Sequence, residues 1–287
     1  MKHTVTFFNL GGLLLAILGV NLNTNPALDQ LVQEKYLAKP QLNEYTYEAE
    51  FNEKDYAKSL ENLGITLHPG TDFTPESKDS PSSLNHCKSL VYRTLKSLPP
   101  EPVRKLKNLT LYFSDDGRRG LGGGTTIILR CQNVTDEELV GVLVHEMGHI
   151  ADTGVLNGTA AEGESGYMDG GNVIYKDDPS VKFYNLSFNT DGKIKEDATE
   201  YDFVSGYAKS DPFEDFAESY AYYILHGSEF RVLMQTNVIL TTKYNFLKTE
   251  VFNGKEYFNG DDKEADAQER SYDVTVLPYS MKKFFVI

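Results

Sequence analysis

The stretch Val142-Leu-Val-His145-Glu146-Met-Gly-His149-Ile150 decides the fold prediction, because it places an H-E-x-x-H motif within an apolar run. Four residues make about one turn of an α-helix, so His145 and His149 project from the same face and can bind one metal ion. Glu146 lies beside them and can reach a water molecule on that ion. Two imidazoles, a carboxylate and a water give zinc a four-coordinate shell with one exchangeable position. The motif therefore predicts a zinc site that still needs a third protein ligand.

The residues on either side of the motif favour a helix. Thr135 and Glu138 have the spacing of a capping box, and Gly154 is the expected end of the helix. Apolar residues supply a packing face: Leu139, Val140, Val142, Leu143, Met147 and Ile150. The alternative is a buried helix whose two histidines are hydrogen-bonded and bind no metal. A third ligand elsewhere in the chain decides between these interpretations.

The composition is that of an ordinary soluble protein, and 287 residues are enough for one large domain or two small ones. The formal net charge of −14 argues against binding to nucleic acids or anionic membranes, because both need clustered Lys and Arg. No internal repeat is visible in the sequence. We expect a monomer.

Residues 1–20 have the pattern of an export signal. Lys2 and His3 precede an apolar core that is too short to span a bilayer as a permanent helix. The small-residue cleavage pattern is imperfect, so an uncleaved amino-terminal anchor is the alternative. Either way, the chain is predicted to be secreted or held at the cell surface. In that compartment we expect Cys87 and Cys131 to form a disulfide, with two buried free thiols as the alternative.

Three segments of different composition follow the signal. Residues 21–83 are polar and acidic, and they predict a partly ordered lead-in with a short helix near residues 55–63. Residues 84–258 form the predicted main domain, and residues 259–287 form a tail with apolar runs that suggest a docked strand. Within the main domain, the hydrophobic pattern predicts a helix at 84–98 and strands at 110–113 and 125–131.

A glycine-rich segment, Gly120-Leu-Gly-Gly-Gly124, lies between the two predicted strands. It does not fit a dinucleotide-binding loop, because such a loop leads into a helix and this one leads into a strand. A flexible hairpin or the rim of a cleft is the better interpretation. In zinc proteases the strand before the metal-binding helix often borders the cleft, where an extended peptide can add as another strand. Residues 125–131 are therefore the candidate for substrate alignment.

The third ligand has one good candidate segment. A continuation of the motif as H-x-x-G-x-x-H fails, because Asp152 and Val155 occupy the positions of its glycine and last histidine. A G-T-x-D-x-x-Y-G segment, which would supply an aspartate ligand, is also missing. Residues 206–220 remain, and they contain several carboxylates at helical spacing.

Asp211 and Pro212 predict the start of a helix that ends near residue 226. On this helix Glu214 and Glu218 share a face, so Glu214 can coordinate the metal while Glu218 holds the free ring nitrogen of a ligating histidine. The alternative is that Asp211 and Glu214 form nothing more than a capping box.

H-E-x-x-H followed by G-Y-A-x-x-x-P-x-E-D-F-A-E resembles zinc metallopeptidases related to the anthrax lethal factor catalytic domain and to the clostridial Pro-Pro endopeptidases. Residues 243–257 are also similar to the tail segment of their uncharacterised bacterial relatives. The resemblance covers roughly residues 84–258, and only the two metal-site blocks are specific. About sixty residues separate those blocks, which is longer than in the compact Pro-Pro enzymes, so substrate preference does not carry over.

The resemblance implies a role for each matching residue. The three metal ligands match His145, His149 and Glu214, and the general base matches Glu146. A tyrosine seven residues before the ligating glutamate assists catalysis in the family, and Tyr207 holds that place here.

We therefore expect one α+β, zincin-like domain, mostly helical with a small mixed β-sheet, that binds one Zn²⁺ per chain. The expected function is a secreted zinc-dependent endopeptidase acting on a peptide or protein substrate. One alternative is an exported, non-catalytic binding protein with a structural or vestigial zinc site, which would have no need of Glu146. A second alternative is hydrolysis of a different amide, such as a cell-wall crosslink.

Overall fold

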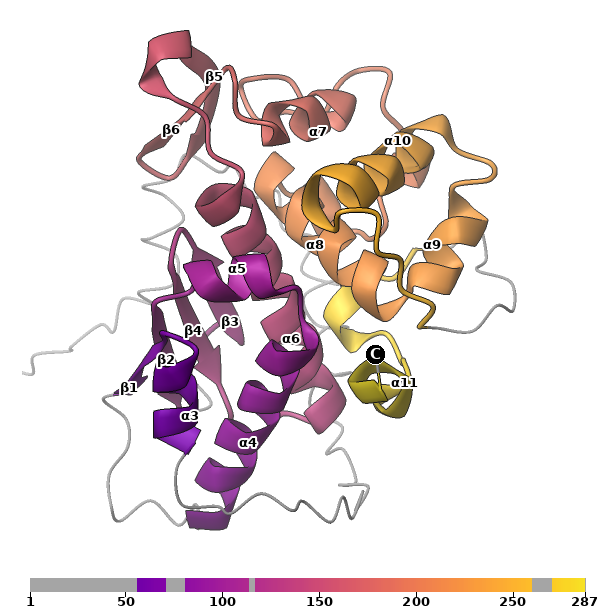
Figure 1. The fold of residues 1–287 in the computed structure, drawn as a ribbon. Coiled ribbons are helices and arrows are strands. Elements are labelled where there is room, and N and C mark those ends of the chain that lie inside the picture. Colours follow the sequence, from indigo (N-terminus) through magenta and orange to yellow (C-terminus); the bar gives the residue numbers. More distant parts are fainter. Residues whose placement is uncertain (1–55, 71–80, 114–116, 260–269, 287) are drawn as a thin grey trace, which may run out of the picture. The chain divides into compact units, whose positions relative to one another are not determined.

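The computed structural model describes residues 56–70, 81–113, 117–259 and 270–286, which all belong to the unit Glu48–Ile287 (Figure 1). The predicted export signal and most of the acidic lead-in lie outside these residues. No helix within the described ranges is long and apolar enough to cross a membrane. The architecture is α+β, as predicted, with many helices and a small mixed sheet.

A four-stranded sheet lies next to the motif helix. Its strands, in spatial order, are β1 (Thr66–Pro69), β2 (Asn108–Tyr112), β4 (Thr126–Arg130) and β3 (Gly120–Gly123). The first three run parallel, and β3 pairs antiparallel with β4. Along β4, Ile127 and Leu129 are buried, whereas Thr126 and Ile128 face the other side of the sheet. The predicted strands at 110–113 and 125–131 are confirmed, with slightly shifted ends.

The structure tests two predictions for this region. Gly120–Gly123 is a strand that pairs with β4 through a turn at Gly124, whose φ is 56°, so the predicted hairpin is confirmed. Because β4 is hydrogen-bonded to a neighbour on both sides, the prediction that residues 125–131 align an extended peptide is wrong. In the described part of the chain, the open edge at this end of the sheet belongs to β3.

The motif lies in α6 (Asp136–His149), so the predicted helix is confirmed. Of the predicted capping box only the Thr135 half forms, because the Glu138 carboxylate pairs with Arg119 at 3.0 Å. The Thr135 hydroxyl accepts a hydrogen bond from the backbone N–H of Glu138 at 3.1 Å. Past α6 the chain continues as a π-helical turn, Ile150–Val155, so the helical run ends one residue after the predicted Gly154. α6 lies between the sheet and α8 (Figure 1).

The second motif block forms α8 (Pro212–Leu225), which crosses α6 at close range. Gly148 permits this approach, since a Cβ at that position would lie 2.8 Å from the Ala217 Cα. Asp211 caps α8 as predicted, and its carboxylate accepts hydrogen bonds from two backbone N–H groups of the first turn, each at 2.9 Å. The approach at Gly148 holds α8 close to α6, and the Asp211 cap fixes where α8 begins.

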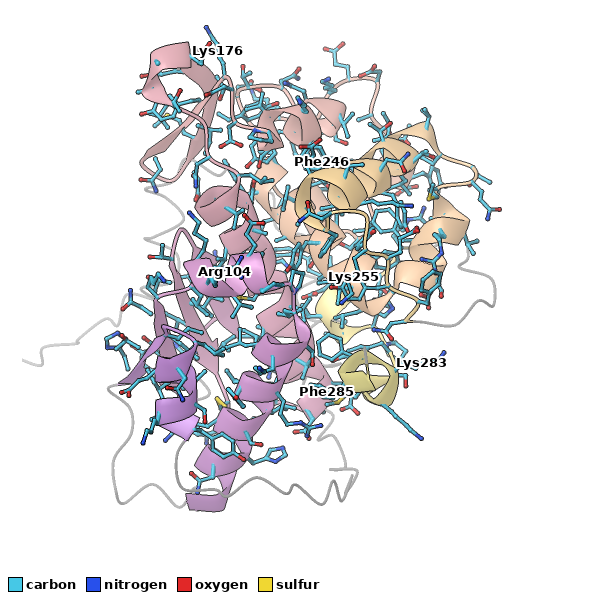
Figure 2. The ribbon with its side chains drawn as sticks, in the orientation of Figure 1. Arg104, Lys176, Phe246, Lys255, Lys283 and Phe285 are labelled. Atoms are coloured by element: carbon cyan, nitrogen blue, oxygen red, sulfur yellow. A yellow bond between two sulfur atoms is a disulfide. The ribbon has the colours of Figure 1, made fainter. Side chains whose placement is uncertain are left out.

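Other helices surround this crossing. They are α3 (Tyr56–Asn62), α4 (Pro81–Ser97), α5 (Pro100–Lys105), α7 (Ser180–Ser187), α9 (Gly227–Leu233) and α10 (Val238–Phe246). The helices predicted near 55–63 and at 84–98 are therefore confirmed. Aromatic rings fill the space between α7, α8 and α10: the Phe246 ring lies 5.6 Å from that of Phe183 and 6.2 Å from that of Phe216 (Figure 2).

Two long-range links tie these elements together. A disulfide joins Cys87 of α4 to Cys131, directly after β4, which confirms the predicted pair. Lys243 of α10 forms a fully buried ion pair with Asp215 of α8, with Nζ 2.6 and 2.9 Å from the two carboxylate oxygens. The same Nζ donates to the backbone carbonyl of Asp202 at 2.8 Å. The sequence pattern did not predict this second link.

The carboxy-terminal residues fold as helices, so the predicted docked strand is wrong. Val274–Val276 is a 3₁₀ turn, and Met281–Val286 forms the short helix α11. The Val274 backbone N–H, which a strand would use for pairing, instead donates to the side chain of Glu218 at 2.9 Å. Phe284 is buried, so the apolar side chains do dock on the domain, but through helical spacing.

The long segment between the motif blocks contains a β-hairpin. Its strands are β5 (Glu164–Asp169) and β6 (Asn172–Tyr175), and α7 follows it. Tyr167 anchors the hairpin, because its buried hydroxyl donates to the Phe188 carbonyl at 2.9 Å and lies 3.0 Å from Asn185 Oδ1. The segment between the motif blocks is therefore ordered and packs on α7.

Candidate metal centre

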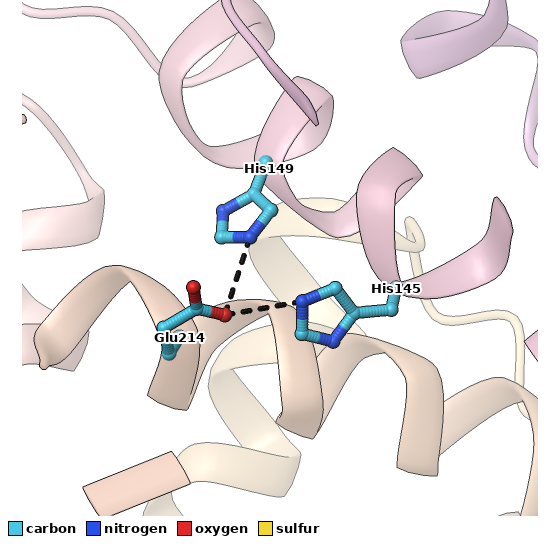
Figure 3. Close-up of side chains that lie close together, drawn as sticks. All are labelled: His145, His149 and Glu214. Carbon is cyan, nitrogen blue, oxygen red and sulfur yellow. Dashed lines mark hydrogen bonds and ion pairs between the residues drawn. The ribbon is translucent and has the colours of Figure 1, made fainter. Parts of the chain in front are cut away.

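Two helices bring the three predicted ligands together. His145 and His149 lie one turn apart on α6, and Glu214 lies in the first turn of α8. Glu214 Oε2 is 3.1 Å from His145 Nε2 and 3.4 Å from His149 Nε2 (Figure 3). One potential ligand atom from each residue lies within 4.8 Å of the other two. The three side chains can therefore hold a single metal ion.

The position of Glu214 argues against the capping-box alternative. In a capping box its carboxylate would turn back to the backbone N–H of Asp211. Instead, Oε2 faces the two histidines, and Oε1 accepts a hydrogen bond from the Tyr207 hydroxyl at 3.0 Å. Asp211 caps the helix alone, which leaves Glu214 free for the site.

The three ligand side chains also form one charge cluster. Burial by itself lowers the pKa of His145, but hydrogen bonds to Glu214 and Glu218 outweigh burial and raise that pKa well above its ordinary value. Burial likewise favours a neutral Glu214, yet its hydrogen bonds with both histidines hold the pKa of the carboxyl well below its usual range. The metal-free cluster therefore pairs protonated imidazole with an anionic Glu214, and a metal ion that displaces these protons would meet a carboxylate oxygen and two imidazole nitrogens, a donor set that suits zinc and related divalent ions.

As predicted, Glu218 binds the ring nitrogen of His145 that does not face Glu214. Its Oε1 lies 2.7 Å from His145 Nδ1, which leaves Nε2 directed at Glu214. Its other oxygen accepts hydrogen bonds from the Ser205 hydroxyl at 2.5 Å and from the Val274 backbone N–H at 2.9 Å. The carboxylate is fully buried and fixed on both sides. Sequence reasoning missed Ser205 and Val274, because neither carries a local signal for this contact.

The Glu146 side chain extends from α6 to the edge strand β3. A Cβ on Gly120 would overlap its carboxylate, and a Cβ on Gly122 would lie 2.8 Å from its Oε2. Burial raises the pKa of Glu146, and the charges of His145 and His149 oppose that rise. The alternating glycines of β3 therefore make room for this carboxylate, and their spacing of two was the signal that could have revealed them.

Tyr207 stands at the side of the cluster, in the 3₁₀ turn Tyr207–Lys209. Its hydroxyl donates to Glu214, and its ring centroid lies 6.1 Å from that of His145. Burial, followed by the nearby Glu214 carboxylate, raises its pKa, so the phenol stays protonated and acts as a hydrogen-bond donor.

Three comparisons with known proteins found no match to this chain. No protein-family model matches the sequence, and searches of curated proteins and of solved structures found no match. The resemblance to the lethal factor group therefore stays a prediction that depends on the two motif blocks.

Proposed function

We propose that this chain is a zincin-like metallopeptidase that hydrolyses peptide bonds with one zinc ion per chain. The observation that carries the proposal is the convergence of His145, His149 and Glu214 from two crossing helices, with Glu146 directly beside them. The disulfide is consistent with an oxidising compartment, and we extend the proposal to a secreted or cell-surface enzyme.

The three ligands fit a catalytic zinc site because three protein donors leave one position for water or substrate. When bound, the ion would lower the pKa of a coordinated water toward about 7 and polarise the substrate carbonyl. Glu218 keeps the His145 ring in the orientation that directs Nε2 to the centre. Replacing Glu218 would therefore loosen the site without removing a ligand.

Glu146 is the proposed general base. Its carboxylate is held between α6 and β3, next to the two histidines of its own helix. It would take the proton from the attacking water and pass it to the departing amine. A structural zinc site has no need of such a carboxylate, so this residue favours the enzyme over the non-catalytic binding protein.

Tyr207 is the proposed oxyanion donor. Its hydroxyl already donates to one oxygen of Glu214, so the phenol is aimed at the cluster. Transferring that hydrogen bond to the oxygen of the scissile carbonyl would stabilise the negative charge that develops there. The contact would be stronger in the transition state than in the ground state.

The edge strand β3 is the proposed platform for the peptide backbone. Its outer edge has no partner strand in the described part of the chain, and its glycines lie against Glu146. Leu121 is 52% exposed on this strand, beside the open edge. An extended peptide could add to β3 by backbone hydrogen bonds, which would carry its scissile bond past the metal centre.

A peptide library tests the proposed function. The purified chain should cleave internal bonds of the library, a chelator should stop cleavage, and added zinc should restore it. Glu146→Gln should bind zinc as tightly as the wild type and cleave nothing. Wild-type cleavage rates in that variant would remove the base assignment, and a zinc-loaded wild type that cleaves no peptide would favour the non-catalytic alternative.

A further inference from the structure

A pocket of about 560 Å³ lies beside the metal centre, between the β3–β4 edge and the β5–β6 hairpin. One wall is formed by the edge strand, including Gly122, and by Thr153 of the π-helical turn. The hairpin contributes Asp169 and Asn172 to the opposite wall. This volume falls within the range of pockets that bind small molecules or single side chains.

The pocket is continuous with the reactive centre. Gly122, which lines it, packs against the backbone oxygen and the carboxylate of Glu146. Thr153 accepts a hydrogen bond from the Gly124 N–H at 2.9 Å and donates one to the backbone carbonyl of His149 at 3.0 Å. A residue bound along β3 next to the scissile bond can therefore direct its side chain into this space.

Asp169 is the only ionisable residue among those that line the pocket. It is partly buried, and within the described residues its carboxylate has no hydrogen-bond or ion-pair partner. Its charge interacts with His149 and Glu214, which places it near the ligand cluster. It lies two residues after the anchored Tyr167 and pairs across the hairpin with Asn172, so the packed hairpin fixes its position. A fixed, partly desolvated carboxylate without a partner favours a cation from outside the chain.

The remaining lining suits the rest of a long basic side chain. Leu121, Ile128 and Val173 provide apolar surface for a methylene stem, and Asn172 provides a polar group near the carboxylate. We propose that this pocket binds a lysine or arginine side chain of the substrate, next to the scissile bond, with Asp169 as the residue that determines specificity. The inference rests on the proposed peptidase function and adds a substrate class to it.

Matched peptides test this inference. Once library cleavage has located the scissile bond, each flanking position is occupied in turn by arginine, by its neutral isostere citrulline, or by glutamate. At one position, kcat/KM for arginine should exceed that for citrulline by at least about tenfold, and glutamate should be cleaved most slowly. Asp169→Asn should reduce the arginine preference, measured as the ratio of kcat/KM for the arginine peptide to that for the citrulline peptide, to about twofold or less.

Glu164→Gln is the matched control, because Glu164 is an exposed carboxylate on the same strand and does not line the pocket. This variant should keep the full preference for arginine. Equal kcat/KM values for arginine and citrulline at every flanking position would overturn the inference while leaving the peptidase intact.

Peptide binding distinguishes a failure of the pocket assignment from a failure of the proposed peptidase function. Library peptides that contain a single arginine, and the same peptides with citrulline in its place, are titrated into zinc-loaded Glu146→Gln by fluorescence anisotropy, with and without Asp169→Asn. Tighter binding of arginine that depends on Asp169 supports the pocket assignment, even when the wild type cleaves neither peptide and the proposed function fails. Absence of an arginine preference in binding overturns the pocket assignment, whatever the cleavage result.

Discussion

Asp152, in the π-helical turn after the motif, should make the stability of the protein depend on pH. Its side chain is fully buried and accepts a hydrogen bond from the Tyr184 hydroxyl at 2.6 Å. Burial raises the pKa of Asp152 from 3.8 to about 7, although the hydrogen bond from the Tyr184 hydroxyl opposes the rise. The folded chain therefore holds a proton that the unfolded chain releases near pH 4.

This difference in proton binding determines the direction in which the free energy of unfolding changes with pH. Below about pH 4 both states hold the proton, and between about pH 4 and 7 only the folded state does, so stability falls as pH rises. Above about pH 7 the folded chain must bury the Asp152 carboxylate. The difference between the two pKa values then corresponds to a loss of about 4 kcal/mol.

Urea unfolding of the wild type and of Asp152→Asn, with a chelator present, measures this effect. The asparagine does not titrate but keeps a carbonyl oxygen for the Tyr184 hydroxyl. Between pH 4 and 8, the unfolding free energy of the variant minus that of the wild type should rise by about 4 kcal/mol. All other titrating groups are shared, so their contributions cancel. Parallel pH profiles for the two proteins would refute the reasoning.

Three further predictions concern residues around the site. Glu218→Gln should weaken zinc binding about 10- to 100-fold, since the ring of a ligating histidine loses its charged partner, and competition with a chelating dye would measure it. Lys243→Met should cost about 3–5 kcal/mol in urea unfolding, because the buried Asp215 loses its partner and must either keep an unpaired charge or take up a proton; an unchanged midpoint would contradict the buried pair. Tyr207→Phe should lower kcat about 100-fold with unchanged zinc content, and a wild-type rate would return Tyr207 to a packing role.

The sequence predicted that His145, His149 and Glu214 lie together, because the signals that place them are local. The spacing of His145 and His149 requires only that the segment be helical, and Thr135 and Asp211 mark where the two helices begin. The meeting of Glu214 with the histidines then follows from a close crossing of α6 and α8 at Gly148.

The failures have a common physical origin in contacts between distant segments. Gly120–Gly123 has weak strand propensity, so its role as the edge strand beside the motif was not predicted, and Glu146 leaves no room for side chains on that face. The β-branched run after Asp273 looked like a strand, but Glu218 takes its first N–H. The Lys243–Asp215 pair joins residues on two separate helices with no periodic pattern between them.

Zinc binding by the metal-free chain tests the central claim most directly. Isothermal titration calorimetry should give one zinc per chain for the wild type and for His68→Ala, a control histidine on β1 outside the cluster. Glu214→Ala and His145→Ala should lose tight binding while keeping the helical circular dichroism of the wild type. Unchanged affinity and stoichiometry in Glu214→Ala would contradict a metal centre built from these two helices.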